Sequence, residues 1–177
     1  MAGFCIVLLM MGFFLPVLII AVMIFLTVAV VTIFNYVMES FALYRLCKNS
    51  NYKHPALAWI PFYNRVILGD FAGNKKMGYI TFILKIVFLV LFIVFLGFID
   101  YIPENIRDIY SNVISIISLI TSILNIILVH LIMKKSIPKA ADVLTVINVF
   151  TFGISKAIIL FVLRNNEKLI KQEVIEW

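Results

Sequence analysis

The chain opens with MAGFCIVLLMMGFFLPVLIIAVMIFLTVAVVTIFNYVM, residues 1–38, a stretch without a single Asp, Glu, Lys, Arg or His. A helix needs only about 20 apolar residues to cross a hydrocarbon core that is about 30 Å thick. The opening run therefore has enough apolar residues for one crossing, with residues to spare. It predicts an integral membrane protein.

The composition of the whole chain points the same way. Apolar residues make up 64% of the chain and charged residues 14%, and the mean hydropathy is +1.12. Soluble domains have roughly 45 to 50% apolar and about 25% charged residues. The net charge of +6 does not indicate a nucleic-acid partner, because most Lys and Arg residues lie in short loops between apolar runs rather than on one face of a soluble domain. In such loops they set membrane topology and contact anionic lipid headgroups.

We expect one polytopic, all-helical domain, residues 1–177, with about four transmembrane helices. The predicted spans are residues 15–37, 77–98, 113–133 and 143–163. Gly12 and Pro16 favour a separate short apolar segment at residues 1–14, although proline can also kink a helix that continues through the membrane. One long bent helix is the alternative for this region.

The short loops differ in basic residues, and this difference predicts orientation. Loop 39–76 has six Lys or Arg residues and loop 134–142 has three, whereas loop 99–112 has only Arg107. The positive-inside rule places the first two loops in the cytoplasm and the third, with the N-terminus, outside. Four complete crossings would leave the basic residues of the tail, 164–177, outside as well. Either the last apolar run is a re-entrant hairpin that turns near Gly153, or the N-terminal run hides an extra crossing.

Loop 39–76 is the most structured of the predicted soluble parts. Its portion 55–63 is apolar but too short to cross, which is typical of interfacial or re-entrant segments. Aromatic rings with one polar group favour the headgroup level. We therefore predict interfacial anchors at Trp59, Tyr63 and Arg65.

A resemblance lies in the same loop. The string LYRLCKNSNYKHPALAWIPFYNRVILGDFAG, residues 43–73, resembles a pattern in small uncharacterised multi-span membrane proteins of Gram-positive bacteria. The pattern is a basic helix end, a proline, Ala-Trp-Ile-Pro, an asparagine and an apolar stretch bounded by glycines. The resemblance implies a multi-pass fold in a cell membrane and no particular activity.

Two lysines fall within the predicted spans, where charge is costly and indicates function unless the side chain snorkels to the headgroups. These are Lys85 and Lys156. Asn125 is predicted at the depth of Lys85 and could hydrogen-bond to it. Asn148, two turns from Lys156, is a weaker candidate partner, and both amides are also typical of contacts between helices.

Motifs of catalysis and metal binding are missing. No predicted span contains Asp or Glu, neither His54 nor His130 has a metal ligand at useful spacing, and HExxH, GxSxG and P-loop patterns are absent. Cys5 and Cys47 form no framework of disulfides, although Cys47 at a membrane edge allows palmitoylation. We expect no enzyme activity, no catalytic residues, no cofactor and no metal.

Lysines buried without anions in their own chain favour an acidic membrane partner. We therefore expect a non-enzymatic accessory or interaction subunit of a membrane complex, bound to another membrane protein or to further copies of itself. The tail supports docking, since Leu169, Ile170, Val174 and Ile175 approximate the spacing of an amphipathic helix. The alternative is a homo-oligomeric channel or small-solute transporter in which the lysines attract anions.

Overall fold

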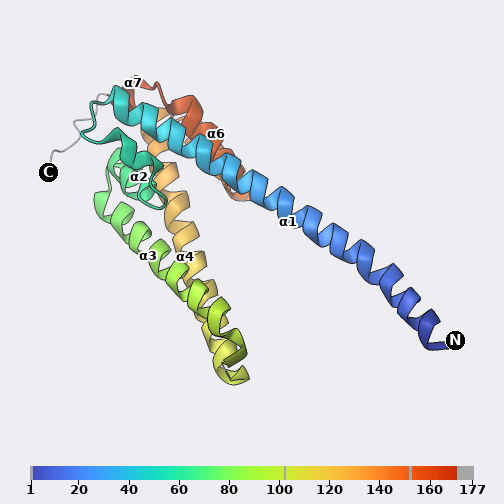
Figure 1. Cartoon of the computed structure of the whole chain (residues 1–177). Helices are drawn as coiled ribbons and strands as arrows, with labels where there is room; N and C mark the ends of the chain where they lie inside the picture. Colours follow the sequence, from blue (N-terminus) through green and yellow to red (C-terminus); the bar gives the residue numbers. More distant parts are fainter. Residues whose placement is uncertain (1, 102, 152, 171–177) are drawn as a thin grey trace. The chain divides into compact units, whose positions relative to one another are not determined.

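The computed structural model describes residues 2–101, 103–151 and 153–170, and within them the chain folds into helices alone (Figure 1). With 86% helix, the all-helical class is confirmed. The elements are α1 (Ala2–Asn49), η1 (Pro55–Trp59), α2 (Asn64–Ala72), α3 (Lys75–Phe98), η2 (Ile99–Tyr101), α4 (Glu104–Ser136), α5 (Ala141–Phe150), α6 (Ile154–Leu163) and α7 (Glu167–Ile170). Three helices are long and apolar enough to cross a membrane: Phe14–Asn49 within α1, α3 and α4.

The chain divides into two compact units, Met1–Val37 and Met38–Trp177. The first consists of the N-terminal part of α1. Its large apolar side chains are exposed from Phe14 to Phe34, as expected of a helix that has lipid or another helix for its surroundings. The second unit contains the remaining elements and a buried core.

α1 is one continuous helix that runs through Pro16 and ends at Asn49. The helix is therefore continuous where a separate segment at residues 1–14 was predicted, in agreement with the alternative of one long helix, and it extends past the predicted span end at residue 37. The extension past Glu39 has a packing reason. Ala42, Leu43, Leu46 and Cys47 fall on one helical face, and each is at most 2% exposed.

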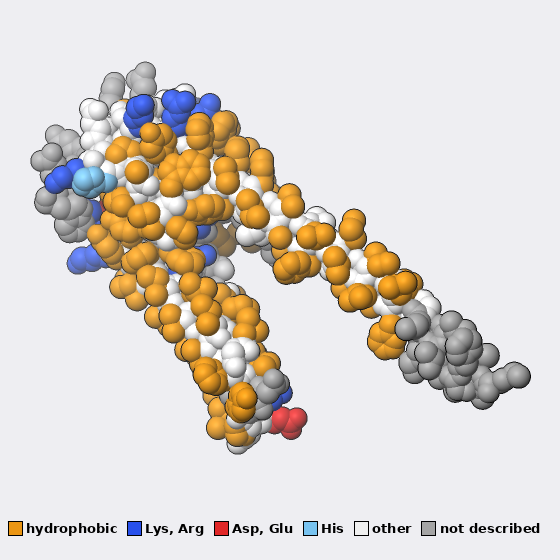
Figure 2. Space-filling view, in the orientation of Figure 1, with side chains coloured by type: hydrophobic (Ala, Val, Ile, Leu, Met, Phe, Trp, Pro, Cys, Tyr) orange, Lys and Arg blue, Asp and Glu red, His pale blue; other side chains and the backbone are white. Residues whose placement is uncertain are grey.

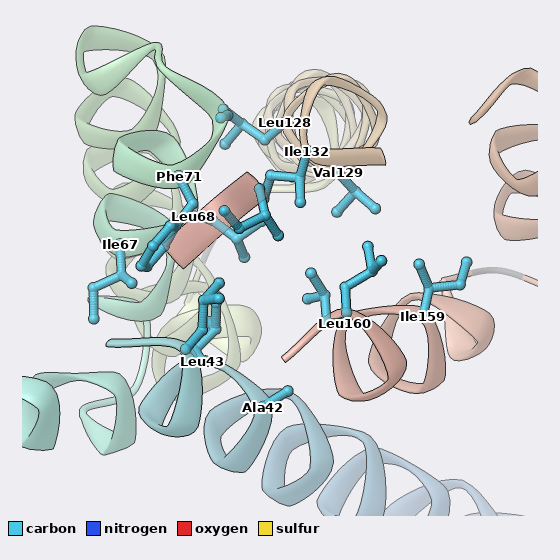
Figure 3. Close-up of a cluster of buried hydrophobic side chains, with 14 of the residues drawn as sticks. Ala42, Leu43, Ile67, Leu68, Phe71, Leu128, Val129, Ile132, Ile159 and Leu160 are labelled. Atoms are coloured by element: carbon cyan, nitrogen blue, oxygen red, sulfur yellow. The ribbon is translucent and has the colours of Figure 1, made fainter. Parts of the chain in front are cut away.

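The core of the second unit includes apolar side chains from α1, α2, α4 and α6 that point toward one another (Figure 3). Its labelled side chains come from α1 (Ala42, Leu43), α2 (Ile67, Leu68, Phe71), α4 (Leu128, Val129, Ile132) and α6 (Ile159, Leu160). Leu169 of α7 is also buried in this core, so the described part of the tail docks on it. Val174 and Ile175, the rest of the predicted amphipathic face, lie outside the described residues.

α2 is short, but nearly all of it is buried against α3 and α4. Its end is set by Gly73, whose left-handed φ of 76° forms the helix cap. Asn74 then caps α3 by accepting a hydrogen bond from the Met77 amide at 3.2 Å. The two caps reverse the chain within a few residues, which places α2 and α3 side by side.

The predicted span 143–163 is not one helix. α5 and α6 have 10 residues each, and Gly153, with a φ of 84°, ends the connection between them. Each helix is about 15 Å long, half of what a crossing requires. The break thus has the form of the alternative hairpin near Gly153. α4 also begins earlier than the predicted span 113–133, because Pro103 precedes its first turn and Glu104 suits a helix N-terminus.

Figure 2 shows Lys and Arg side chains gathered at the end of the α3/α4 pair beside α2, while acidic side chains appear at the opposite tip. The gathered end carries Lys75 and Lys76 at the start of α3 and Lys134 and Lys135 at the end of α4. The two ends of the pair therefore differ in charge, as the loop sequences predict.

The crossing of α2 and α3 depends on two glycines. A Cβ atom on Gly69 would lie 2.6 Å from the Cα of Gly78, closer than packed atoms allow. We expect Gly69→Ala to lower the free energy of unfolding by about 1 to 3 kcal/mol, because the backbones must move apart. Denaturation of the detergent-solubilised protein measures this. Gly97→Ala in α3 is the control, since a Cβ there meets no atom within 4 Å; equal effects of both changes would contradict the close crossing.

Candidate functional site

A buried cluster of charged side chains lies in the second unit, with Glu39 of α1 at its centre. The Arg65 guanidinium of α2 donates a hydrogen bond from Nη1 to Glu39 Oε1 at 2.6 Å. The Lys156 ammonium of α6 lies 2.6 Å from Glu39 Oε2. Arg65 Nη1 also donates to Asn125 Oδ1 of α4 at 2.7 Å. One carboxylate thus connects three helices directly and a fourth through Arg65.

The cluster is removed from solvent. The side chains of Arg65, Glu39 and Lys156 are 10%, 5% and 8% exposed. Burying a charge is costly unless it is paired and hydrogen-bonded. Each of the three is paired, and the pairing of both cations depends on Glu39.

Sequence reasoning did not find Glu39, because the first span was ended at residue 37. The apolar spacing of residues 42, 43, 46 and 47 could have extended the helix past this glutamate. Lys156 therefore has its anion within its own chain, which overturns the premise that the buried lysines lack one. Arg65 also differs from the predicted interfacial anchor, since it points into the cluster rather than to a surface.

Lys85 and Asn125, the predicted pair, belong to neighbouring helices. Both line one pocket between α3 and α4. The Asn125 carbonyl oxygen accepts its hydrogen bond from Arg65, however, and not from Lys85. The donor to Asn125 is therefore Arg65, a predicted interfacial anchor, in place of the predicted donor Lys85.

Asn148 is buried, but its side-chain oxygen is hydrogen-bonded in the turn between α5 and α6 rather than to Lys156. Its Oδ1 accepts a hydrogen bond from Ser155 Oγ at 3.3 Å, and Ser155 and Asn148 both contact Thr151 at the turn between α5 and α6. Asn148 therefore stabilises the turn. Its Nδ2 is buried without a hydrogen-bond partner among the described residues.

Trp59 and Tyr63, the other predicted anchors, lie before α2. Trp59 is 40% exposed. Tyr63 is half-buried, and its ring packs edge-on against Phe82 of α3 with centroids 5.9 Å apart. Their placement at a headgroup layer remains a prediction.

The pocket beside the cluster has a volume of about 230 Å³. It is lined by Phe62, Lys85, Phe88, Leu89, Ser118, Thr121, Ser122 and Asn125. Three of its α4 residues belong to a longer polar row, at intervals of three or four residues: Ser111, Ser115, Ser118, Ser122 and Asn125. Such spacing keeps the row on one face of the helix, over about 21 Å. The polar face leads from the start of α4 to the charge cluster.

A second polar contact holds the loop that follows α1. The Tyr52 hydroxyl donates to Asp70 Oδ2 at 2.8 Å, and Lys75 Nζ lies 4.0 Å from Asp70 Oδ1. Burial raises the pKa of the Asp70 carboxyl above its ordinary value. Burial, followed by the hydrogen bond to Asp70, raises the pKa of the Tyr52 hydroxyl. These groups position α2 without opening to the pocket.

Histidine contacts do not form a metal centre. His130 Nδ1 lies 2.7 Å from Thr145 Oγ1, and the exposed Asp142 is 3.9 Å from Nε2. Within the described ranges no three His, Cys, Asp or Glu side chains are grouped to hold a metal. Cys47 is buried in the core as a free thiol.

Comparison of the chain with protein-family models, with curated proteins and with solved structures finds no match. The site is therefore interpreted from its own chemistry. That chemistry is two cations on one carboxylate, beside a pocket that is lined by a third basic side chain, Lys85, and by hydroxyl groups.

Replacing the central carboxylate tests the cluster. We expect Glu39→Gln to lower the free energy of unfolding by about 3 to 5 kcal/mol, because two buried cations lose their counter-charge. Denaturation in detergent measures the change. Adding Lys156→Met to Glu39→Gln should restore part of the loss, since it removes one of the uncompensated charges.

The matched control is Asp142→Asn, because that carboxylate is 94% exposed. It should change stability by no more than about 0.5 kcal/mol. If Glu39→Gln were as mild as Asp142→Asn, the cluster would have no structural role.

Proposed function

We propose that the chain crosses the membrane three times, with α1, α3 and α4, and that α5 and α6 form a re-entrant hairpin. The support is the break at Gly153 together with two helices of 10 residues each. Three crossings place the N-terminus outside and both loops 50–74 and 137–140 in the cytoplasm. They also place the basic tail in the cytoplasm, which removes the conflict that four crossings create with the positive-inside rule.

Labelling from one side of the membrane tests this topology. In a background of Cys5→Ser and Cys47→Ala, single cysteines are introduced at Lys48, Glu104 and Asn165 and treated with a membrane-impermeant maleimide. We expect Asn165→Cys to react from the same side as Lys48→Cys, and Glu104→Cys from the opposite side. Reaction of Asn165→Cys together with Glu104→Cys would restore the four-span topology.

For the function, we propose a non-enzymatic membrane protein that provides a path for a small solute, as a channel or transporter. The observation that carries this proposal is the polar face of α4, which runs from Ser111 to Asn125 and meets the buried charge cluster. Ser111, Ser115 and Ser122 are exposed in the described chain. A serine hydroxyl that faces lipid finds no hydrogen-bond partner there. A hydroxyl that faces water or a second copy of the chain can form a hydrogen bond.

The charges of the cluster favour an anion as the solute. Arg65 and Lys156 of the cluster are basic and Glu39 is acidic. Lys85, which lines the neighbouring pocket, adds a third basic group. Cations that line a path lower the electrostatic cost of an anion inside a low-dielectric membrane. The excess of basic groups also opposes the entry of cations.

An interaction subunit of a membrane complex is the second candidate. The exposed apolar helix of the first unit favours it, because such a helix offers a long surface to partner helices. The internal pair of Lys156 with Glu39 removes one of its original supports. The exposed polar row fits either a partner of the same kind or a water-filled path.

Flux measurements separate the two candidates. Liposomes that contain the reconstituted protein should release trapped benzenesulfonate or chloride faster than protein-free liposomes do. We expect Ser115→Leu to reduce that release at least about fivefold, because a bulky apolar side chain interrupts the polar row. Ile116→Leu is the control on another face of α4, where the native side chain is 56% exposed.

The outcomes point in different directions. Release that responds to Ser115→Leu and not to Ile116→Leu supports a solute path. Absence of release from correctly folded protein, combined with recovery of a stoichiometric second protein from native membranes, supports the subunit.

A further inference from the structure

The ammonium of Lys85 is the one basic group of the site that the described chain leaves without an ion pair or hydrogen bond. Lys85 is half-buried in α3 and lines the pocket. It lies ten residues after Lys75, so it is about 15 Å along the helix from the cytoplasmic end that we propose. An amine at that depth needs a counter-charge or a polar surrounding.

No free carboxylate in the described cluster meets that need. Both oxygens of Glu39 are already engaged, Oε1 by Arg65 and Oε2 by Lys156. Arg65 and Lys156 repel the Lys85 ammonium, and Glu39 attracts it. The site therefore has room for one more negative charge near Lys85.

Two hydroxyl groups can help to hold such a charge. Ser118 and Ser122 line the pocket with Lys85, and within the described chain neither hydroxyl forms a hydrogen bond. Thr121, by contrast, donates to the Ile117 carbonyl at 2.7 Å. A serine hydroxyl can donate to an anion, and hydrogen bonds to charged groups are stronger than neutral ones.

The remaining wall of the pocket is apolar. Phe62, Phe88 and Leu89 line it. A cavity of about 150 Å³ accommodates benzene, and this pocket measures about 230 Å³. An aromatic or short aliphatic body with one charged group fits this volume and both walls.

Phe62 occupies its wall at a cost to the backbone. Its φ of 68° is left-handed, a conformation that a bulky side chain rarely adopts. Such conformations persist where the surrounding structure fixes them, and they cluster at ligand sites. Here the left-handed residue lies in the turn before α2 and is itself part of the pocket lining.

We propose that the pocket between α3 and α4 binds a small monovalent organic anion, with its carboxylate at Lys85, Ser118 and Ser122 and its apolar body against Phe62, Phe88 and Leu89. The inference rests on the proposed function in that it names the class of solute. The anion's carboxylate can belong to a free organic acid or to a fatty acid of the bilayer, of which only the first carbons would lie in the pocket.

Binding measurements on the full chain test the site. The protein is reconstituted in nanodiscs of phosphatidylcholine and titrated with benzoate at pH 7. Isothermal calorimetry measures the heat of binding during the titration. We expect saturable binding of benzoate and at least tenfold weaker binding of benzamide, its neutral counterpart of similar shape. Equal affinity for the two would overturn an anion site.

Variants assign the binding to its residues. Lys85→Met should weaken benzoate binding at least tenfold, and Lys85→Arg should retain most of it because the charge stays. Lys76→Met is the matched control, since it removes a lysine from the exposed start of α3. Ser118→Val should weaken binding without a change in charge, so the proposal remains testable if Lys85→Met fails to fold.

Further titrations identify the source of the anion. Oleate that competes with benzoate, and binds more tightly in a Lys85-dependent way, would assign the site to fatty acids. Benzoate binding that oleate leaves unchanged would assign it to soluble acids. If Lys85→Met and Ser118→Val left the affinities for benzoate and oleate unchanged, the proposal would be overturned.

The site and the transport function can fail separately. Lys85-dependent binding without flux keeps the site and contradicts transport. Flux that responds to Ser115→Leu, without Lys85-dependent binding, keeps transport and contradicts this site.

Discussion

The second unit of the protein depends on one carboxylate that is shared by two cations. Glu39 receives the Arg65 guanidinium on one oxygen and the Lys156 ammonium on the other. Removal of Glu39 would leave both cations buried without a counter-charge, so this carboxylate holds together the three helices that carry the cluster. Apolar packing between helices in lipid gains little from the hydrophobic effect, so such polar contacts contribute to specificity.

The same constraint explains how short helices can belong to the interior of this unit. α2 and α6 are too short to cross a membrane, yet nearly all of α2 and half of α6 are buried. The amides and carbonyls of a buried turn need hydrogen-bond partners. The turns before α2 and before α6 supply them within the backbone, for example from the Arg65 amide to the Phe62 carbonyl and from the Gly153 amide to the Asn148 carbonyl.

The sequence predicted the helical class, the apolar segments and the polar residues within them, because hydropathy and charge act locally. It also identified Gly153 as a possible turn. It did not predict that the first helix continues through Glu39, since a glutamate after a long apolar run is a common end of a span. The pairing of Glu39 with Arg65 and Lys156 could not be read from spacing either, because it joins distant segments of the chain. Asn125 shows the limit clearly: the sequence marks it as a polar residue within an apolar segment, but it does not reveal Arg65 as its partner.

The distance along the chain between Glu39 and its partners has a consequence for biosynthesis. Chains emerge N-terminus first, so α1 reaches the membrane with its carboxylate before either cation has been made. Arg65 follows soon afterwards on the next helix, and this first pair can protect the carboxylate while α3 and α4 are inserted. Lys156 is made only after α3 and α4. The α5 and α6 segment therefore completes the cluster last, and until it packs, the Oε2 atom of Glu39 lacks the Lys156 ammonium.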